Sequence, residues 1–411
     1  MRIVFHLSTN CNLRCTYCYQ HDKASSVMPF EYAKRLLDDL FLYKVEQKGC
    51  IFSKTVMRPD ILLEPIVLNF FGGECTLYLD LIQQIIQYFE ELCDKYNQKE
   101  WKDTYEIWVE TNGTTFLQPD VYEFYKKYKD RLDVPITIDG CKECHDKCRL
   151  TVNGEGSYDI VEEGVKAHFE LFGHQPNSKL TFCKDNIHYM KEIVQNLVSL
   201  GYTYIRGSWD GTDVNMSSEQ SLEYYQCLKE AIDYVIDNKI NFWLWILGYA
   251  REEVLGPLHT ASCGSDGSQI AINWDGDIYF CQQLSESFIG DKDKELRLGN
   301  INTGITNLEG LLSFYNNLGN NILDYECFNC PLANLCEPCP AVNLKIYNQT
   351  NHLALNCGAG IATARALIYF AKRAQETDYP YFQREVKLIQ DYFKDGLPDR
   401  KYKIEILHPE E

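Results

Sequence analysis

The chain has 411 residues, of which 45% are hydrophobic and 24% charged, and its formal net charge is -19. This length predicts a large domain with a smaller one appended. The acidic balance argues against a nucleic-acid partner, which needs clustered Lys and Arg, and fits a neutral or basic peptide better. No apolar run reaches the roughly 20 residues that cross a bilayer, so no membrane partner is expected.

The cysteine content bears on the cellular compartment. The N-terminus shows no basic region, apolar stretch and cleavage site in sequence, so no export signal is expected and a cytoplasmic location is predicted. The cytosol keeps thiols reduced, so 18 cysteines in an unexported chain indicate metal ligands rather than a disulfide framework.

The first half of the chain alternates short apolar runs with segments of helical period, which is typical of βα units. Helical spacing of apolar residues is clear around Leu36 and around Ile85. Six units predict an α/β fold built on a partial (β/α)6 TIM-like barrel. The predicted strands are 3–7, 66–71, 105–109, 134–138, 180–182 and 203–205.

The second half changes in texture along its length. Helical pattern covers 218–238, and the apolar run 242–247 is expected to be a core strand, with the lining of a peptide groove as the alternative. Cys, Gly, Pro and Asn then dominate up to Cys357, and a mostly helical tail follows. The predicted domains are 1–255 for the barrel with a bridging segment, 256–357 for a small cysteine-rich domain and 358–411 for the tail.

The first cysteine cluster, Cys11-x3-Cys15-x2-Cys18, directly follows the first predicted strand. In barrel folds, catalytic groups collect at this end of the strands. Three thiolates on one loop can bind three irons of a 4Fe-4S cluster and leave the fourth iron for an external ligand. The alternative is structural zinc, which usually needs four protein ligands, and His21 is the only nearby candidate for the fourth.

The spacing of these cysteines, with Tyr17 before the last one, resembles the Cys-x3-Cys-x-aromatic-Cys signature of the radical S-adenosylmethionine (SAM) superfamily. Phe71-Gly72-Gly73-Glu74, after the second strand, resembles a second motif of that family. The resemblance implies that the glycines let the backbone approach the methionine of SAM and that Glu74 accepts a hydrogen bond from its amino group.

Two further motifs strengthen the resemblance. Glu110-Thr111-Asn112-Gly113 ends the third strand, and Thr137-Ile138-Asp139-Gly140 ends the fourth, with His145, Asp146 and Arg149 after it. In peptide-modifying and protein-modifying members of the family, the latter residues lie near the ribose and carboxylate of SAM. The alternative for each motif is a strand-end turn with a capping polar residue. The cofactor-binding residues implied by the resemblance are Tyr17, Gly72, Gly73, Glu74, Thr111, Asn112, Thr137, Asp139 and Arg149.

The cysteines downstream resemble the SPASM extension, which binds two auxiliary 4Fe-4S clusters. The resemblance implies an outer cluster on Cys327, Cys330, Cys336 and Cys357, and an inner cluster on Cys263, Cys281 and Cys339. Only Glu337 and Pro338 separate the last two cysteines of the central group, where the family usually has three residues. A zinc ribbon is the alternative. Cys141, Cys144 and Cys148 are expected to pack rather than to bind metal.

The inner set stops at three cysteines, which favours an open iron that could bind a substrate thiolate, as in thioether-forming relatives; His259 closing the site is the alternative. Sulfatase-maturing relatives carry an acid where this chain has Gln282. The resemblance therefore predicts an enzyme that cleaves SAM to a 5′-deoxyadenosyl radical and installs a cysteine-to-carbon thioether in a ribosomally made precursor peptide.

Alternatives to this function are a carbon–carbon cross-linking or epimerising maturase, a sulfatase-type formylglycine maturase, and a non-catalytic zinc-binding protein. The cofactors implied are SAM and three 4Fe-4S clusters, one radical-generating and two auxiliary. The expected partners are the precursor peptide and an electron donor such as flavodoxin or ferredoxin. Because the chain begins at its first barrel strand, a separate leader-binding protein is also considered.

Overall fold

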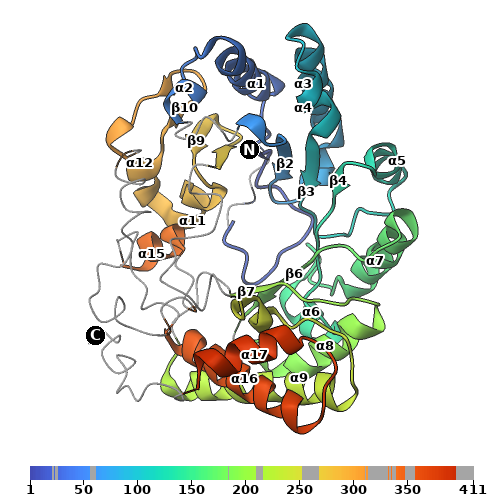
Figure 1. Cartoon of the computed structure of the whole chain (residues 1–411). Helices are drawn as coiled ribbons and strands as arrows, with labels where there is room; N and C mark the ends of the chain where they lie inside the picture. The colour runs from blue at the N-terminus through green and yellow to red at the C-terminus, as the bar shows by residue number, and fades with distance from the viewer. Residues whose placement is uncertain are drawn as a thin grey trace. The chain divides into compact units, whose positions relative to one another are not determined.

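The computed structural model divides into two compact units (Figure 1). The first comprises 1–137, 151–177 and 262–319, and the second 138–150, 178–261 and 320–411. The residues that the structure describes are 1–20, 23, 26–55, 62–183, 185–209, 216–251, 268–310, 312, 332, 335, 339–347 and 357–394.

The first unit is built on an eight-stranded sheet with the order β11-β10-β9-β8-β1-β2-β3-β4. Its centre is parallel, because β1 pairs in parallel with both β2 and β8, and β3 pairs in parallel with β2 and β4. This arrangement confirms the predicted α/β fold with a central parallel sheet. The parallel strands are β1 (Arg2–His6), β2 (Val67–Phe71), β3 (Glu106–Val109), β4 (Leu132–Asp133) and β8 (Gln269–Ile272).

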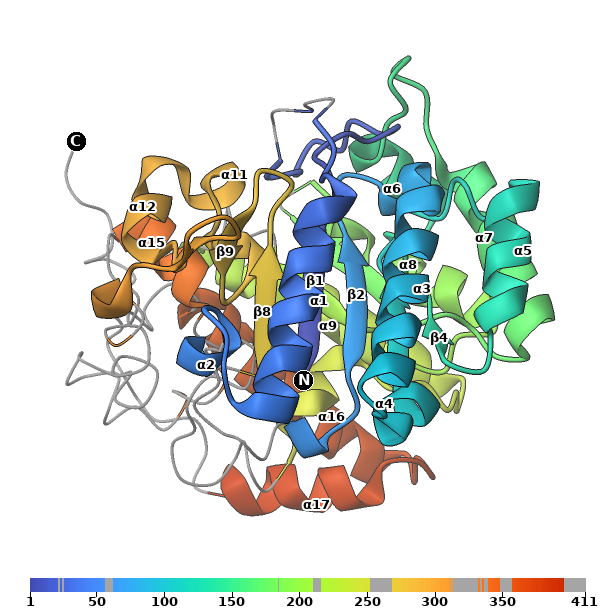
Figure 2. The same ribbon diagram turned by 90° about the horizontal axis from the view of Figure 1, so that it is seen from above.

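Helices α1 (Phe30–Glu46) and α3 (Leu79–Lys95) lie side by side against β1 and β2 (Figure 2). Their apolar residues recur at helical spacing, so each helix presents one buried stripe. Phe5 and Phe70 stack at a centroid distance of 5.6 Å, and Ile3 and Leu68 are fully buried. This packing fixes the ends of the strands that carry the sequence motifs.

Two predicted strands were misplaced. The expected strand 134–138 is shortened to β5 (Ile136–Thr137), while β4 ends before it; Pro135, which lies between the two strands, has no N–H for a ladder. The expected strand 203–205 lies instead at β7 (Gly207–Trp209), which pairs in parallel with β6 (Ser178–Phe182).

The expected core strand 242–247 is also wrong. Only Trp243 makes an isolated bridge, to Tyr204, and the chain then turns into the 3-10 helix η4 (Trp245–Tyr249). The apolar side chains Phe242 and Leu244 are nevertheless buried, so the run belongs to the core even though it is not a strand.

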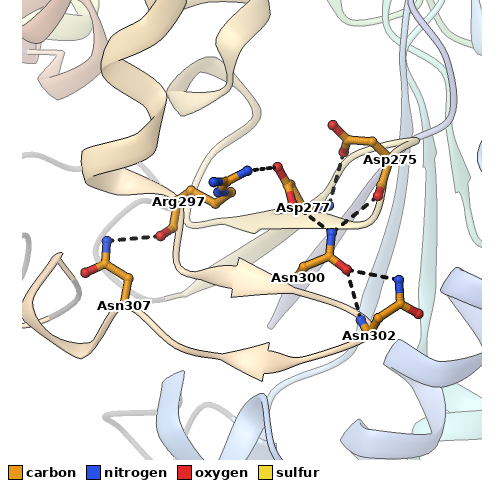
Figure 3. A network of polar contacts seen from close by, with 6 residues as sticks. All are labelled: Asp275, Asp277, Arg297, Asn300, Asn302 and Asn307. Carbon is orange, nitrogen blue, oxygen red and sulfur yellow. Dashed lines mark hydrogen bonds and ion pairs between the residues drawn. The ribbon is translucent and has the colours of Figure 1, made fainter.

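The sequence did not predict that β8 joins β1, or that an antiparallel extension of β9 (Asp277–Tyr279), β10 (Gly299–Asn300) and β11 (Gly304–Ile305) follows. Gly276 makes the β8–β9 turn with a φ of 87°. A polar network holds this extension together (Figure 3).

In that network, Arg297 Nη1 donates to Asp277 Oδ2 at 2.6 Å, and Asn300 Nδ2 donates to Asp277 Oδ1 at 2.7 Å and to the Asp275 carbonyl at 3.3 Å. The Asn302 backbone N–H donates to Asn300 Oδ1 at 3.0 Å, and Arg35 of α1 donates to Asn302 Oδ1 at 2.5 Å. The bond from Arg35 therefore fixes the extension to α1.

The second unit is mainly helical. Helix α9 (Ser218–Asp237) begins with a capping box of Ser217 and Gln220, and it packs against α16 (Cys357–Glu376). Arg373 of α16 pairs with Asp233 at 3.0 Å and with Asp237 at 2.6 Å. The helical C-terminal region expected from the sequence is therefore present.

None of the described helices is long and apolar enough to cross a membrane. Shorter and peripheral elements complete the described fold. They are α2 (Phe52–Thr55), η2 (Cys75–Tyr78), α4 (Lys99–Thr104), α5 (Pro119–Tyr128), α6 (Lys142–Cys148), α7 (Tyr158–Phe172), η3 (Ile187–Tyr189), α8 (Met190–Ser199), η6 (Gln282–Leu284), α11 (Glu286–Ile289), η7 (Gly290–Lys292), α12 (Asp293–Leu296), α15 (Pro340–Tyr347) and α17 (Gln383–Tyr392).

Candidate functional site at the ends of β1, β2 and β3

The loop after β1 carries the first three cysteines. Cys11 is buried, whereas Cys15 and Cys18 are half-buried. The Leu13 backbone N–H donates to Cys11 Sγ at 3.4 Å, and Lys23 Nζ donates to Cys18 Sγ at 3.0 Å. Burial raises the pKa of the Cys11 thiol, so a thiolate there needs positive charge such as a metal supplies. His21, the candidate fourth zinc ligand, lies outside the described residues.

The Gly72-Gly73 turn after β2 packs directly on the segment that leads into Cys11. The Gly73 N–H donates to the Ser8 carbonyl at 2.8 Å, and the Glu74 N–H donates to the Asn10 carbonyl at 2.9 Å. A Cβ at Gly73 would lie 2.1 Å from the Asn10 oxygen, and one at Gly72 would lie 2.7 Å from the Ser8 oxygen. The contact with the cysteine loop therefore requires both glycines; their approach to SAM stays a prediction.

Glu74 joins the ends of β2 and β3. Its side chain is 1% exposed. Thr76 Oγ1 and Thr111 Oγ1 donate to Oε1 at 2.6 Å and 2.8 Å, and the Asn112 N–H donates to Oε2 at 2.7 Å. Burial raises the pKa of the carboxyl, whereas these donors favour the carboxylate. Glu74 thus organises the site, and a contact between this acid and SAM stays a prediction.

The loop after β3 reaches back to the first cysteine. Asn112 Nδ2 donates to Cys11 Sγ at 3.7 Å and to Asn12 Oδ1 at 2.8 Å. The residues that sequence reasoning missed here are Ser8, Asn12, Thr76 and Thr114, all polar neighbours of motif residues. The only signal in the sequence that could have identified these four residues is that each lies close to a motif residue.

The third group of predicted residues is divided between the two units. Thr137, in the first unit, donates its backbone N–H to the Thr111 carbonyl at 3.2 Å. In the second unit, Asp139 is fully buried and its Oδ1 accepts from the Thr181 N–H at 3.2 Å. Arg149, at the end of α6, is 5% exposed. The structure thus brings Thr137 to the β3 loop.

The Cys141, Cys144 and Cys148 motif lies in the second unit. Cys144 and Cys148 are fully buried. Cys144 Sγ donates to the Asp139 carbonyl at 2.9 Å, and Cys148 Sγ lies 3.8 Å from Cys183 Sγ. Among the cysteines that the structure describes, none forms a disulfide. These contacts agree with cysteines that pack in the core.

The predicted auxiliary-cluster ligands are only partly described. Cys281, in the first unit, is half-buried, and its Sγ donates to Gln282 Oε1 at 3.6 Å. Cys339 and Cys357, in the second unit, are also half-buried. Cys263, Cys327, Cys330, Cys336 and His259 lie outside the described residues. Within the described ranges, no three His, Cys, Asp or Glu side chains are grouped to hold a single metal ion.

A buried histidine connects the cysteine loop with the sheet. His6 is completely buried, with Nδ1 3.3 Å from Asn273 Oδ1 and Nε2 3.4 Å from Gln20 Nε2. Its ring meets that of Trp274 edge-on at 4.8 Å. Burial lowers the pKa of His6 to about 4, so the ring is neutral at pH 7 and accepts the hydrogen bond from Gln20. Sequence reasoning assigned it no role.

The donor set of this site fits an iron–sulfur cluster held by one loop. A cubane distributes three thiolates over three different irons, so the ligands need not converge on one ion. The sulfurs of Cys11 and Cys18 already receive N–H donors, as cluster thiolates commonly do. The site therefore combines a three-cysteine loop, a glycine turn packed on it, and a buried acid that joins two strand ends.

Residues 5–192 match the Radical SAM superfamily. The chain is 31% identical over 167 residues to a cysteine-type anaerobic sulfatase-maturating enzyme of Clostridium novyi, which covers 39% of this chain and 37% of that protein. It is 24% identical over 308 residues to the antilisterial bacteriocin subtilosin biosynthesis protein AlbA of Bacillus subtilis, covering 73% of this chain and 57% of AlbA.

Among solved structures, native anSMEcpe with bound AdoMet and Cp18Cys peptide superposes with a TM-score of 0.66 at 18% identity, covering 95% of this chain and 99% of that one. At this identity the likeness shows that the fold is shared. The matched part of the chain spans well under half of the Clostridium novyi relative, at 37% of its length.

Proposed function

Because this chain belongs to the radical S-adenosylmethionine superfamily, we propose that it is a peptide maturase that joins a cysteine sulfur to a carbon atom within a ribosomally made precursor peptide. The superfamily implies an enzyme that uses SAM and a 4Fe-4S cluster. The observation that carries the proposal is the packing of the Gly72-Gly73 turn on the segment that enters Cys11.

In this proposal, Cys11, Cys15 and Cys18 hold the radical-generating cluster. When bound, the cluster and SAM together supply a radical that removes hydrogen from a substrate carbon. The chain's own residues position that chemistry. Glu74 keeps the ends of β2 and β3 together, and the turn of Gly72 and Gly73 fixes the backbone before Cys11. The full set proposed to contact SAM is Tyr17, Gly72, Gly73, Glu74, Thr111, Asn112, Thr137, Asp139 and Arg149.

The auxiliary clusters are a further part of the proposal. Cysteines of the second half of the chain would hold two of them, and an open iron on the inner one would bind the substrate thiolate. A thiolate on iron is deprotonated and positioned, which suits carbon–sulfur bond formation. The proposed ligands are Cys263, Cys281 and Cys339 for the inner cluster, and Cys327, Cys330, Cys336 and Cys357 for the outer one. The proposed domains remain 1–255, 256–357 and 358–411.

Gln282 favours the thioether product over a formylglycine product. Its carboxamide lies beside Cys281, where its Oε1 accepts from the thiol at 3.6 Å. A carboxamide has no basic group that takes up a proton near pH 7, whereas the acid of sulfatase-maturing relatives does. The identity of 31% to a sulfatase-maturating enzyme nevertheless supports formylglycine formation as the second candidate.

The partners follow from the chemistry. A peptide substrate is supported by relatives whose names refer to sulfatase maturation and subtilosin biosynthesis, and by a similar fold that holds a peptide. The proposal adds an electron donor such as flavodoxin or ferredoxin, a separate leader-binding protein, and a cytoplasmic location.

Mass spectrometry separates the two candidates. The reduced protein is incubated anaerobically with SAM and with either precursor peptides encoded beside its gene or a cysteine-containing sulfatase peptide. Thioether formation removes two hydrogens and keeps the sulfur, and replacing the peptide cysteine abolishes the change. Formylglycine formation replaces the cysteine sulfur with oxygen. A loss of two hydrogens that persists without the cysteine refutes the thioether assignment.

A further inference from the structure

We propose that Asn112 is a positioning residue that raises the reduction potential of the cluster on Cys11, Cys15 and Cys18, by holding an N–H donor against Cys11 Sγ. The inference rests on the proposed function, because it requires a cluster at these cysteines. It assigns the Asn112 side chain a role toward the thiolate, in addition to the contact with SAM proposed above.

The side chains of Asn12, Thr114 and Asn112 form a closed ring of hydrogen bonds. Asn12 Nδ2 donates to Thr114 Oγ1 at 2.7 Å, Thr114 Oγ1 donates to Asn112 Oδ1 at 2.6 Å, and Asn112 Nδ2 donates to Asn12 Oδ1 at 2.8 Å. Around the ring, each side chain donates one hydrogen bond to the next side chain and accepts one from the side chain before it. The ring joins the cysteine loop to the loop after β3.

The ring fixes which way the Asn112 carboxamide faces. Its Oδ1 accepts from both the N–H and the hydroxyl of Thr114, at 3.0 Å and 2.6 Å. Flipping the carboxamide would place its NH2 group against the Thr114 N–H, so the observed orientation is the one that satisfies both groups. Of the two hydrogens on Nδ2, one serves Asn12 and the other points to Cys11 Sγ at 3.7 Å.

The surroundings make this contact effective. Cys11 is 8% exposed and Asn112 is 6% exposed, so water screens the contact little. The Leu13 N–H is the second donor to the same sulfur, at 3.4 Å. Cys11 Sγ therefore receives one donor from its own loop and one from the loop after β3.

The backbone of Asn112 does a separate task. Its N–H donates to Glu74 Oε2 at 2.7 Å, and Thr111 Oγ1 donates to Oε1 at 2.8 Å. A substitution of the Asn112 side chain leaves both of these bonds in place. The effect on the thiolate can thus be tested without removing the acid's partners.

The sign of the effect follows from charge. A reduced cluster carries one more negative charge than an oxidised one, so an N–H donor to a ligand sulfur favours the reduced form and raises the potential. Removing the donor makes reduction harder. If one hydrogen bond to a charged sulfur changes the equilibrium constant for reduction about tenfold, the reduction potential changes by about 59 mV for a one-electron couple.

The test is a potentiometric titration of the reconstituted holoenzyme followed by electron paramagnetic resonance. Asn112→Leu removes the donor at similar volume and adds no charge. Thr114→Ser keeps the hydroxyl that orients the carboxamide and serves as the conservative control. Asn186→Leu is the matched Asn→Leu control, because Asn186 is fully buried in the second unit and its side chain bonds to the backbone of Cys183 and Thr181.

The expected result is a potential about 59 mV more negative in Asn112→Leu, with wild-type potentials in Thr114→Ser and Asn186→Leu. A wild-type potential in an Asn112→Leu protein that contains wild-type iron overturns the inference. If Asn112→Leu loads little iron, Asn112→Ser is measured in its place, because the serine hydroxyl is too short to reach the sulfur. A wild-type potential at wild-type iron content in Asn112→Ser then overturns the inference in the same way. Wild-type protein that binds no cluster at Cys11, Cys15 and Cys18 contradicts the proposed function instead.

Discussion

Replacing Gly73 by alanine perturbs the site through backbone contacts alone. The added Cβ would lie 2.1 Å from the Asn10 oxygen and 2.4 Å from the Thr9 oxygen. An ordinary contact is 3.4 Å or longer, so the Asn10 oxygen must retreat by about 1.3 Å. Both neighbours are backbone atoms that lead directly into Cys11, so no flexible side chain can give way.

The expected cost is about 3 kcal/mol, the upper part of the range for overpacking, because the shift also strains the bonds from Gly73 to Ser8 and from Glu74 to Asn10. The midpoint of thermal unfolding should fall by about 3 °C, and iron content after anaerobic reconstitution should fall with it.

Gly248→Ala is the matched control, because a Cβ at Gly248 meets nothing within 4 Å. Gly72→Ala should be intermediate, since its nearest neighbour is the Ser8 oxygen at 2.7 Å. A Gly73→Ala protein with the unfolding midpoint and iron content of Gly248→Ala would refute the account of this turn.

Two further predictions concern stability. Burial lowers the pKa of His6 to about 4, so folding keeps this ring neutral. The contribution of the neutral ring to the free energy of unfolding is complete above pH 6.5 and is lost as the pH falls toward 4. The wild type should therefore lose about 1.4 kcal/mol more than His6→Gln between pH 7.5 and 5.5, and equal losses in urea titrations would count against a neutral buried His6. Asp39 accepts from the N–H groups of Cys50, Ile51 and Phe52 at 2.6, 3.1 and 2.9 Å, so Asp39→Ala should cost about 2–4 kcal/mol and Asp39→Asn less; identical unfolding curves for the two variants would contradict this.

The sequence predicted the parts of the fold that depend on local pattern. The first three strands and the helices around Leu36 and Ile85 lie where the periodicity placed them, with strand ends that agree within one residue. The pairing of β8 with β1 joins residues more than 260 positions apart, and nothing in either segment encodes the partner. Pro135 separates β4 from β5, so that only Ile136 and Thr137 of the predicted strand 134–138 lie in a strand, and the apolar pattern of 134–138 did not reveal this.

For the site, the motifs identified which loops matter but not how they interact. The spacing of glycine and acid in Gly72-Gly73-Glu74 suggested a turn for a ligand, whereas the structure shows that both glycines are needed for contact with the chain itself. The ring of Asn12, Thr114 and Asn112 joins positions about 100 residues apart, so only the three-dimensional arrangement reveals it.

The most direct test of the central claim compares two triple variants. Replacing Cys11, Cys15 and Cys18 together by alanine should remove the iron and labile sulfide of one 4Fe-4S cluster and abolish the formation of 5′-deoxyadenosine from SAM. Replacing Cys50, Cys93 and Cys227, which lie before α2, on α3 and on α9 respectively, should leave both unchanged. Wild-type iron content and undiminished SAM cleavage in the first variant would contradict the account.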